Sequence, residues 1–319
     1  MHGGKMNILK PAAVIGTNSW GSALYEKAIR GSVVDEATIK AAVNKAIECD
    51  LLIFDSARDY GFGKGPKMIG ELCPEPIVLS SKYTPVTKYK KGQVKESFDK
   101  DLKDFKRDKI EIYWLHLPNG IEENLAEIIE LYRQGKIEHI GVSNFDLDEC
   151  KKAKAVLEAA GIPLYGVQNH YSLLDRTWEE NGLVEWCMEN DISFWAWAVL
   201  EEGILAGPAR KEEKFSLMKA IFSRRRKKLK KLYALMQKVG ERHDISIAQV
   251  AIAFVANKGI VPVCGCRKPY QVEELCTAAN VKLTEKEMSR LQEASDALHV
   301  RILGADMFRF AVSGGNKKK

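Results

Sequence analysis

The stretch Phe54-Asp-Ser-Ala-Arg-Asp-Tyr60-Gly61 places a carboxylate where an apolar strand ends and a phenol five residues later, beside a glycine. Leu51-Leu-Ile-Phe54 is a short apolar run rich in strand formers, so we expect a strand that ends at Asp55. The backbone must leave the sheet at that point, which puts the polar side chains that follow at the edge of the sheet.

Two further apolar runs also end in a polar residue. Lys82 closes the run Ile77-Val-Leu-Ser-Ser-Lys82, and His116 closes the run Ile110-Glu-Ile-Tyr-Trp-Leu-His116. Successive strands therefore present polar groups at what we expect to be the same edge of the sheet.

Apolar runs of four to seven residues alternate along the chain with amphipathic stretches of ten or more. This alternation is typical of parallel strands joined by crossover helices. We expect a first-turn acid at Asp35 and helix C-caps at Gly135 and Gly161. The predicted strands are residues 13–16, 51–55, 77–82, 110–116, 137–143, 163–168, 192–197 and 260–263. The predicted helices are residues 35–48, 66–72, 90–105, 121–134, 147–160, 181–190, 224–242 and 247–257.

Eight strand–helix units over about 300 residues fit an α/β fold of the (β/α)8 or TIM-barrel type, whose active sites lie at the C-terminal ends of the strands. No linker rich in Pro, Gly or Ser divides the chain, so we expect a single domain over residues 1–319. The alternative is a doubly wound dinucleotide-binding sheet, which requires G-x-G-x-x-G after a strand. Gly61-Phe-Gly63-Lys-Gly65-Pro66 has proline at the third glycine, so we interpret it as a flexible turn that positions Tyr60.

The composition is that of a folded protein with a large core, since 45% of the 319 residues are hydrophobic and 29% are charged. Residues 1–7 lack the apolar core of a signal peptide, and no run approaches the roughly 20 apolar residues of a membrane span. Seven scattered cysteines, an odd number, favour reduced thiols over disulfides. These features predict a cytoplasmic protein with no membrane partner.

The net charge of +6 includes a basic run at residues 224–231. This run lacks the interleaved aromatic residues that stack on bases, so a solvated helix face explains it better than nucleic-acid binding does. The six histidines form no H-E-x-x-H pair, and Cys264 and Cys266 have no partners at zinc spacing. We therefore expect neither a nucleic acid nor a metal ion.

The polar residues at the strand ends are suited to protonating a carbonyl oxygen. A phenol has an unperturbed pKa of about 10, so Tyr60 needs help to act as a general acid near neutral pH. An ammonium at Lys82 lowers the pKa of a nearby phenol, and Asp55 can hold that ammonium in a partly dry pocket. His116 can orient or polarise the substrate oxygen. The reagent that this set lacks is a hydride, which a redox cofactor supplies.

Short segments of glycine, polar and apolar residues follow one another in a specific order: Gly16-Thr17, Trp20-Gly21, Phe54-Asp55 through Tyr60-Gly61, Ser81-Lys82, Leu115-His116-Leu-Pro118, Gly135-Lys-Ile137, Ile140-Gly-Val-Ser-Asn-Phe145, Gln168-Asn-His-Tyr-Ser-Leu-Leu174, Leu200-Glu-Glu-Gly-Ile-Leu-Ala-Gly207 and Gly265-Cys-Arg-Lys-Pro269. Over nearly the whole chain they resemble the aldo-keto reductases, (β/α)8 barrels that transfer hydride from a nicotinamide cofactor to an aldehyde or ketone. The resemblance implies a small-molecule carbonyl substrate. It also implies Tyr60 as the general acid, Lys82 and Asp55 as its tuning pair, and His116 as the substrate-orienting group.

The resemblance further implies a set of cofactor contacts. Ser143, Asn144 and Gln168 match the positions that hold the nicotinamide carboxamide, and their donors and acceptors suit a planar amide. Trp197 matches the residue that stacks on the nicotinamide ring. The other matched positions are Gly16 and Thr17 near the cofactor, Leu200 and Gly203 in the pyrophosphate segment, and Arg267, Lys268 and Gln271 at the adenosine end. Two cations there favour a 2′-phosphate, so we expect NADPH in preference to NADH.

Several positions depart from the family pattern. Leu275 replaces an adenine-binding asparagine, Leu117 replaces an aromatic residue, and Glu201 and Glu202 put acids into the pyrophosphate segment. Two alternative functions stay open at this point. One is a cofactor-binding regulatory barrel similar to channel-associated β subunits, and the other is an aldolase or lyase that forms a Schiff base on Lys82.

Overall fold

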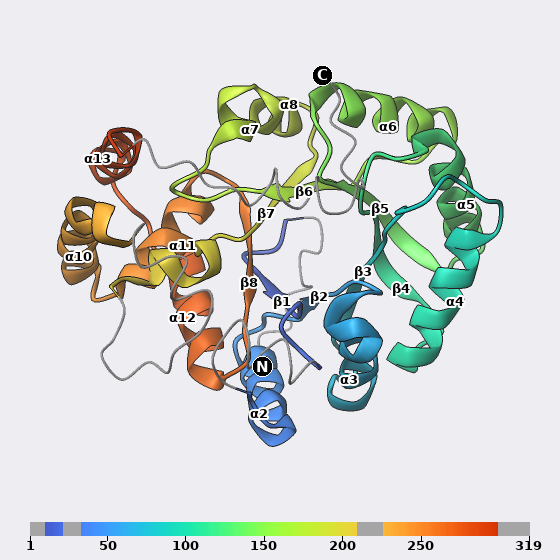
Figure 1. Cartoon of the computed structure of the whole chain (residues 1–319), viewed down its shortest axis with the longest axis horizontal. Coiled ribbons are helices and arrows are strands. Elements are labelled where there is room, and N and C mark those ends of the chain that lie inside the picture. The colour runs from blue at the N-terminus through green and yellow to red at the C-terminus, as the bar shows by residue number, and fades with distance from the viewer. Residues whose placement is uncertain (1–9, 22–32, 209–225, 299–319) are drawn as a thin grey trace.

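The computed structural model describes residues 10–21, 33–208 and 226–298. In this part of the chain the strands are parallel and close into a barrel in chain order, with β8 hydrogen-bonded back to β1 and helices around the outside (Figure 1). The predicted (β/α)8 barrel is confirmed, and the doubly wound sheet is excluded. A single domain over the full span 1–319 stays a prediction. The strands are β1 (Val14–Gly16), β2 (Ile53–Asp55), β3 (Val78–Tyr83), β4 (Ile110–Leu115), β5 (Ile137–Ser143), β6 (Gly166–His170), β7 (Ser193–Trp197) and β8 (Val261–Gly265).

All eight predicted strands are present, with bounds that shift by a few residues. The largest shift is at β6, which begins at Gly166 and continues through His170. Pro163 has no N–H to donate, so the hydrogen-bonded ladder does not start where the apolar run starts. The extension of β6 places His170 at a strand end.

Helices follow the strands as predicted, with three additions. α7, α12 and α13 are not among the predicted helices, since their apolar positions are few; α12 buries only Val272, Leu275 and Ala278. The elements are α2 (Glu36–Glu48), α3 (Lys64–Leu72), α4 (Gln93–Phe105), α5 (Ile121–Arg133), α6 (Leu147–Ala159), α7 (Thr177–Glu180), α8 (Leu183–Glu189), α10 (Lys230–His243), α11 (Ile247–Asn257), α12 (Pro269–Asn280), α13 (Glu285–Asp296) and the 3-10 helices η2 (Tyr60–Gly63) and η3 (Glu201–Ala206).

The helix ends show which local signals were correct. Gly135 and Gly161 have φ values of +69° and +74° directly after the C-caps of α5 and α6, as expected of glycines that end helices. Asp35 was expected in a first turn, and this was wrong by one position. It is the N-cap of α2, where its carboxylate accepts a hydrogen bond from the backbone N–H of Thr38 at 2.7 Å.

Aromatic rings pack inside the barrel. The Trp114 ring centroid lies 4.9 Å from that of Trp195 and 5.9 Å from that of Tyr165. A Cβ atom on Gly141 would lie 2.3 Å from Cε3 of Trp114, so the indole needs glycine at this place in β5. Trp114 Nε1 donates a hydrogen bond of 2.7 Å to Ser80 Oγ, which ties this packing to β3.

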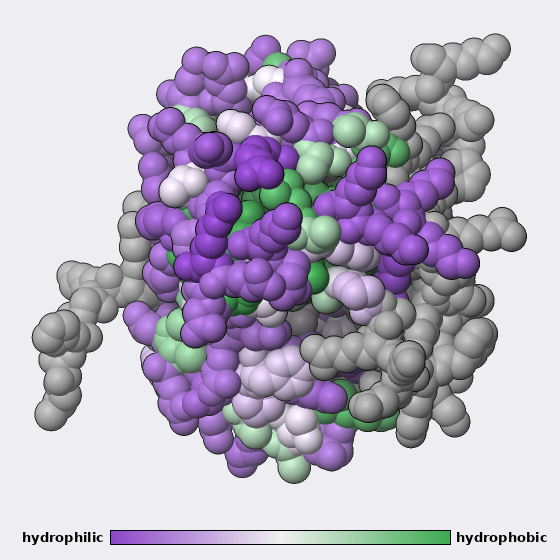
Figure 2. Space-filling model, turned by 90° about the vertical axis from the view of Figure 1, so that its left-hand side faces the viewer, coloured by the Kyte–Doolittle hydropathy of each residue, from purple (hydrophilic) through white to green (hydrophobic). Residues whose placement is uncertain are grey.

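The side of the molecule that carries α10 and α13 is mostly hydrophilic, with small apolar areas between polar side chains (Figure 2). On and just before α10 the lysines of the basic run are exposed, whereas Leu232 and Met236 are buried. The described lysines of the basic run therefore lie on a solvated helix face, but Arg226 is half-buried and donates a hydrogen bond of 3.2 Å to the Gly203 carbonyl. Residues 224 and 225 lie outside the described residues. Of the helices in the described ranges, none is both long enough and apolar enough to cross a membrane.

Candidate active site

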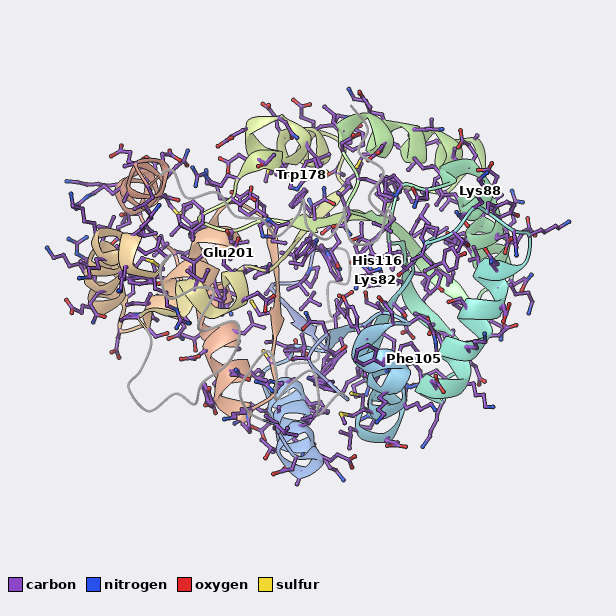
Figure 3. The ribbon with its side chains drawn as sticks, in the orientation of Figure 1. Lys82, Lys88, Phe105, His116, Trp178 and Glu201 are labelled. Carbon is purple, nitrogen blue, oxygen red and sulfur yellow. The ribbon has the colours of Figure 1, made fainter. Side chains whose placement is uncertain are left out.

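Three of the predicted side chains meet at the C-terminal ends of neighbouring strands. Asp55 is the last residue of β2, Lys82 lies one residue before the end of β3, and His116 directly follows β4. All three are buried, with at most 4% of each residue exposed. Lys82 and His116 lie together near the middle of the barrel, and Glu201 lies apart from them (Figure 3).

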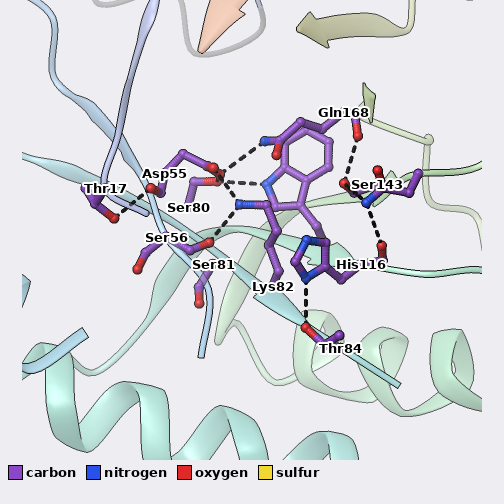
Figure 4. A network of polar contacts seen from close by, with 12 residues as sticks. Thr17, Asp55, Ser56, Ser80, Ser81, Lys82, Thr84, His116, Ser143 and Gln168 are labelled. Atoms are coloured by element: carbon purple, nitrogen blue, oxygen red, sulfur yellow. Dashed lines mark hydrogen bonds and ion pairs between the residues drawn. The ribbon is translucent and has the colours of Figure 1, made fainter. Parts of the chain in front are cut away.

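Asp55 is held by three side-chain donors (Figure 4). Lys82 Nζ lies 2.5 Å from Oδ2 of the carboxylate, while Ser80 Oγ donates to Oδ1 at 2.7 Å and Gln168 Nε2 donates to Oδ1 at 3.1 Å. Lys82 Nζ also donates to the carbonyl oxygen of Ser56 at 2.8 Å. Both ions of this buried pair thus have hydrogen-bond partners beyond each other, which offsets the cost of their removal from water.

Burial shifts the titration of both basic groups at the site. It lowers the pKa of Lys82, and the Asp55 carboxylate opposes that shift. Burial, with the positive charge of Lys82 added, holds the pKa of His116 well below its ordinary value, so the imidazole is neutral at neutral pH. Its Nδ1 atom lies 2.7 Å from Thr84 Oγ1. A hydroxyl can donate to Nδ1, and that arrangement leaves the ring proton on Nε2.

Tyr60 lies beside the buried ammonium. It is half-buried at the start of η2, and Lys82 Nζ is 5.3 Å from the centre of its ring. The chain turns sharply after it, with φ values of +60° at Gly61 and +57° at Phe62. A Cβ on Gly61 would lie 2.4 Å from the carbonyl oxygen of Trp20, so this tight turn requires glycine. The four predicted catalytic groups are thus brought together.

Arg58 anchors the loop between Asp55 and Tyr60 to helix α4. Its Nη1 atom lies 2.6 Å from Oδ2 of Asp104 and 3.3 Å from Oδ1 of Asp101, both on α4. Asp101 is fully buried and also accepts a hydrogen bond of 2.9 Å from Ser81 Oγ. Burial raises the pKa of Asp101 to about 7 against the opposing effects of Ser81 and Arg58. These contacts fix the loop that carries Tyr60 relative to β3.

The residues expected at the nicotinamide carboxamide form one hydrogen-bonded group. Ser143 Oγ donates to the Gln168 carbonyl at 2.7 Å, and Asn144 Nδ2 donates to Ser143 Oγ and to the His116 carbonyl, each at 3.1 Å. Because Gln168 Nε2 donates to Asp55, this group is continuous with the Asp55–Lys82 pair. Asn144 has a φ of +62°, a conformation that asparagine adopts more readily than most residues.

The loop at β1 also contacts Asp55. Gly16 ends β1, and Thr17 is fully buried directly after it. The backbone N–H of Thr17 donates to the Asp55 carbonyl at 3.0 Å, and its hydroxyl donates to the same oxygen at 2.9 Å. Both residues therefore lie beside Asp55, at the predicted edge of the barrel.

The segment after β7 carries Trp197, Leu200 and Gly203. Trp197 ends the strand and is half-buried, unlike Trp195, which is fully buried in the core. Leu200 precedes η3, and Gly203 within it has a φ of +90°. Glu201 does not face outward as its place in a pyrophosphate segment would suggest. It is 5% exposed, and its carboxylate lies against buried groups of the neighbouring loop.

The residues expected at the adenosine end surround the start of α12. Arg267 and Lys268 are half-buried and precede the helix. Gln271 Oε1 accepts hydrogen bonds from the backbone N–H groups of both, at 2.8 and 3.1 Å, so it shapes this turn. Leu275 is fully buried in the core, which gives this departure from the family pattern a packing role.

Several residues of the site carried no isolated sequence signal. Ser80 lies two positions before Lys82, so strand alternation puts both on one face of β3; that spacing is the signal that could have found it. Thr84 and His170 meet the site only through residues distant in sequence. Within the described ranges, no group of three or more His, Cys, Asp or Glu side chains is placed to hold a metal ion.

Comparison with known proteins identifies the family by sequence and shows the same fold among solved structures. The model of the aldo/keto reductase family matches residues 13–296. An aldo-keto reductase of Gibberella moniliformis is 27% identical over 279 residues, which are 80% of this chain and 83% of the relative. The NADH-specific methylglyoxal reductase of Escherichia coli is 26% identical over 287 residues, 80% of this chain and 86% of that protein. A solved aldo-keto reductase from Klebsiella pneumoniae in complex with NADPH has a TM-score of 0.69 at 21% identity, covering 89% of this chain and 90% of that chain.

Proposed function

The chain belongs to the aldo/keto reductase family and is thus a nicotinamide-dependent oxidoreductase, and on that premise we propose that it reduces an aldehyde or ketone with NADPH, using Tyr60 as the general acid. The observation that carries this proposal is the meeting of Tyr60 with the buried ion pair of Lys82 and Asp55. The carboxylate holds the ammonium in place, the ammonium stabilises the phenolate, and the phenol can therefore donate its proton to an oxygen on which negative charge develops.

Lys82 and Asp55 act on Tyr60 and not on the substrate. The ammonium lies 5.3 Å from the ring centre, where it stabilises phenolate and lowers the barrier to proton release. Asp55 and the Ser56 carbonyl hold Nζ in place. The burial of Lys82, with no exposed surface, argues against Schiff-base formation, because a carbonyl carbon would have to reach an amine already committed to two acceptors.

His116 orients the oxygen that Tyr60 protonates. Its neutral imidazole, with the proton on Nε2 when Thr84 donates to Nδ1, can donate a hydrogen bond without competing as an acid. Two donors, a phenol and an imidazole, then converge on one carbonyl oxygen. This is the arrangement that stabilises an oxyanion in acyl and carbonyl chemistry.

The residues at the strand ends fit a nicotinamide cofactor by their donor chemistry. Ser143, Asn144 and Gln168 combine a hydroxyl with two side-chain amides, which suits a carboxamide, and the half-buried Trp197 offers an aromatic face. Gly16, Thr17, Leu200 and Gly203 would border the rest of the molecule, and Arg267, Lys268 and Gln271 its adenosine end. Bound NADPH supplies the hydride that reduces the carbonyl carbon. Arg267 and Lys268 favour a 2′-phosphate, so NADPH is preferred to NADH.

The test is oxidation of NADPH by a panel of aldehydes and ketones, with wild type, Tyr60→Phe and a matched control, Tyr132→Phe in α5. We expect turnover in wild type and in the control, and a loss of about 10²- to 10⁴-fold in Tyr60→Phe, the usual contribution of a general acid. Equal turnover in all three proteins would remove Tyr60 from the mechanism. Tight NADPH binding without turnover on any carbonyl would instead favour the regulatory role.

A further inference from the structure

The buried imidazole of His170 lies between two carboxylates, one of which belongs to the segment expected to hold the cofactor. His170 ends β6 and is 1% exposed. Its Nδ1 lies 3.2 Å from Oδ2 of Asp175, in the loop after β6, and its Nε2 lies 3.0 Å from Oε1 of Glu201, the first residue of η3 after β7. One ring therefore joins two loops at the C-terminal edge of the barrel.

The charges of His170, Asp175 and Glu201 hold these three side chains together. Each ring nitrogen lies within ion-pair distance of one carboxylate oxygen, so a protonated imidazole attracts both carboxylates. Burial by itself lowers the pKa of His170, but the carboxylates of Asp175 and Glu201 outweigh burial and raise it to about 9. The imidazole is thus protonated at neutral pH. Each carboxylate has a second anchor, since Ser172 Oγ donates to Glu201 at 2.5 Å and Thr177 Oγ1 donates to Asp175 at 2.8 Å.

The same ring packs against the residue expected to stack on nicotinamide. His170 and Trp197 are register partners on β6 and β7, with ring centroids 4.8 Å apart and planes at 65°. After Trp197 the backbone takes the left-handed conformation at Ala198, Glu201 and Glu202, with φ values of +60°, +46° and +54°. Such conformations are costly for residues other than glycine, and they persist where the surroundings hold them. The ion pair between His170 and Glu201 supplies such a hold.

The ion pair with His170 sets the direction in which the Glu201 carboxylate points. Directed inward, its carboxylate is neutralised by His170. Without a cation beside it, a buried carboxylate must take up a proton or turn toward water, and a carboxylate turned outward from the Leu200–Gly203 segment would repel a diphosphate there. We propose that His170 is a positioning residue that holds Glu201 inward and Trp197 in place, and so keeps the segment after β7 in the shape that binds NADPH. This inference rests on the proposed function.

The test measures equilibrium binding of NADPH, without turnover, by quenching of tryptophan fluorescence. We expect His170→Gln to weaken binding by about 10- to 100-fold, the scale of one lost charge-assisted contact. The double variant His170→Gln/Glu201→Gln should recover most of that loss, because no carboxylate then remains to turn outward. The matched control is His243→Gln. It removes a different His–Glu contact of 3.0 Å, between His243 at the end of α10 and Glu287 on α13. The NADPH affinity of this control should equal that of wild type.

The wild-type protein provides a second measurement that does not depend on a variant that folds. Among the described residues, the titratable groups that face His170 are Asp175 and Glu201, and loss of the imidazole proton removes the positive charge that lies between them. NADPH affinity should therefore fall as the pH rises through about 9, and this fall should be absent from the double variant. Three results would overturn the positioning role of His170. They are an NADPH affinity of His170→Gln equal to that of wild type, no recovery of affinity in the double variant, and a wild-type affinity that does not change through that pH. Absence of NADPH binding by wild type would instead overturn the proposed function, and with it the positioning role of His170.

Discussion

The ammonium of Lys82 lies 2.5 Å from Oδ2 of Asp55, and both side chains are shut off from solvent. Removing one member of a buried ion pair leaves the other without compensation, whereas removing both does not. Because of this asymmetry, the unfolding free energies of single and double variants report on the charges of the site, whereas turnover reports on its chemistry.

Lys82→Met should destabilise the fold by about 3–5 kcal/mol, because it leaves the Asp55 carboxylate buried and unpaired. The double variant Lys82→Met/Asp55→Asn should be less destabilised than Lys82→Met, since Ser80 and Gln168 still surround a neutral side chain. The free energy of unfolding from urea titration checks both values. A double variant as unstable as the single one would show that packing, and not charge, sets the cost.

The same Lys82→Met variant, assayed under conditions where it is folded, should slow carbonyl reduction by about 10²-fold or more while it leaves NADPH affinity largely intact. The reason is that Lys82 acts on the Tyr60 phenol, 5.3 Å from its ring centre. Turnover and binding are measured separately. Lys100→Met, which removes an exposed ion pair with Glu96 on α4, is the control and should change neither. Undiminished turnover of Lys82→Met would contradict the tuning role.

His116 should make the fold sensitive to acid. Its pKa is held well below the ordinary value by burial and by Lys82, so below about pH 6.5 the unfolded chain binds a proton that the folded protein does not. Its contribution to stability is present above that pH and is lost as the pH falls. His116→Gln should reduce the loss of unfolding free energy between neutral pH and about pH 5 by about 1–2 kcal/mol. An unchanged pH dependence in this variant would show that the imidazole is not held neutral.

Arg267 should discriminate between the two nicotinamide cofactors. A guanidinium that meets a 2′-phosphate contributes about 1.5–3 kcal/mol through charge-assisted hydrogen bonds. Arg267→Ala should therefore weaken NADPH by about 10-fold or more and leave NADH nearly unchanged. Dissociation constants for both cofactors, measured on wild type and variant, decide the matter. Equal effects on the two would remove the argument for phosphate selection.

Gly141 should tolerate no side chain, because a Cβ there would lie 2.3 Å from the Trp114 ring. Gly141→Ala should cost about 1–3 kcal/mol of unfolding free energy by overpacking, and the displaced indole should lose its contact with Ser80. Gly265→Ala is the matched control on β8, where the nearest atom to a new Cβ lies 3.7 Å away; it should change stability by less than about 0.5 kcal/mol. Similar stability of both variants would refute the packing argument.

Local pattern was enough to predict the barrel and the edge at which its site lies. Apolar runs that end in Asp55, Lys82 and His116 are visible without any three-dimensional information, and closure of parallel strands brings their C-terminal ends to one rim. Boundaries were less predictable where one residue changes the hydrogen bonding, as Pro163 does before β6. The helices α12 and α13 escaped prediction because a short apolar stripe leaves little periodic signal.

The sequence by itself determined the order of the eight strands and of most helices between them, and it placed Asp55, Lys82 and His116 at strand ends, because each of these depends on periodicity or on the point where an apolar run ends. Only the tertiary structure decided which way polar side chains point. By sequence Glu201 is an acid in a segment expected to hold pyrophosphate, yet its carboxylate turns inward to His170, which lies 31 positions earlier in the chain. The physical reason is that the energy of a buried charge depends on its neighbours in space, and those neighbours exist only once β6 and β7 lie side by side.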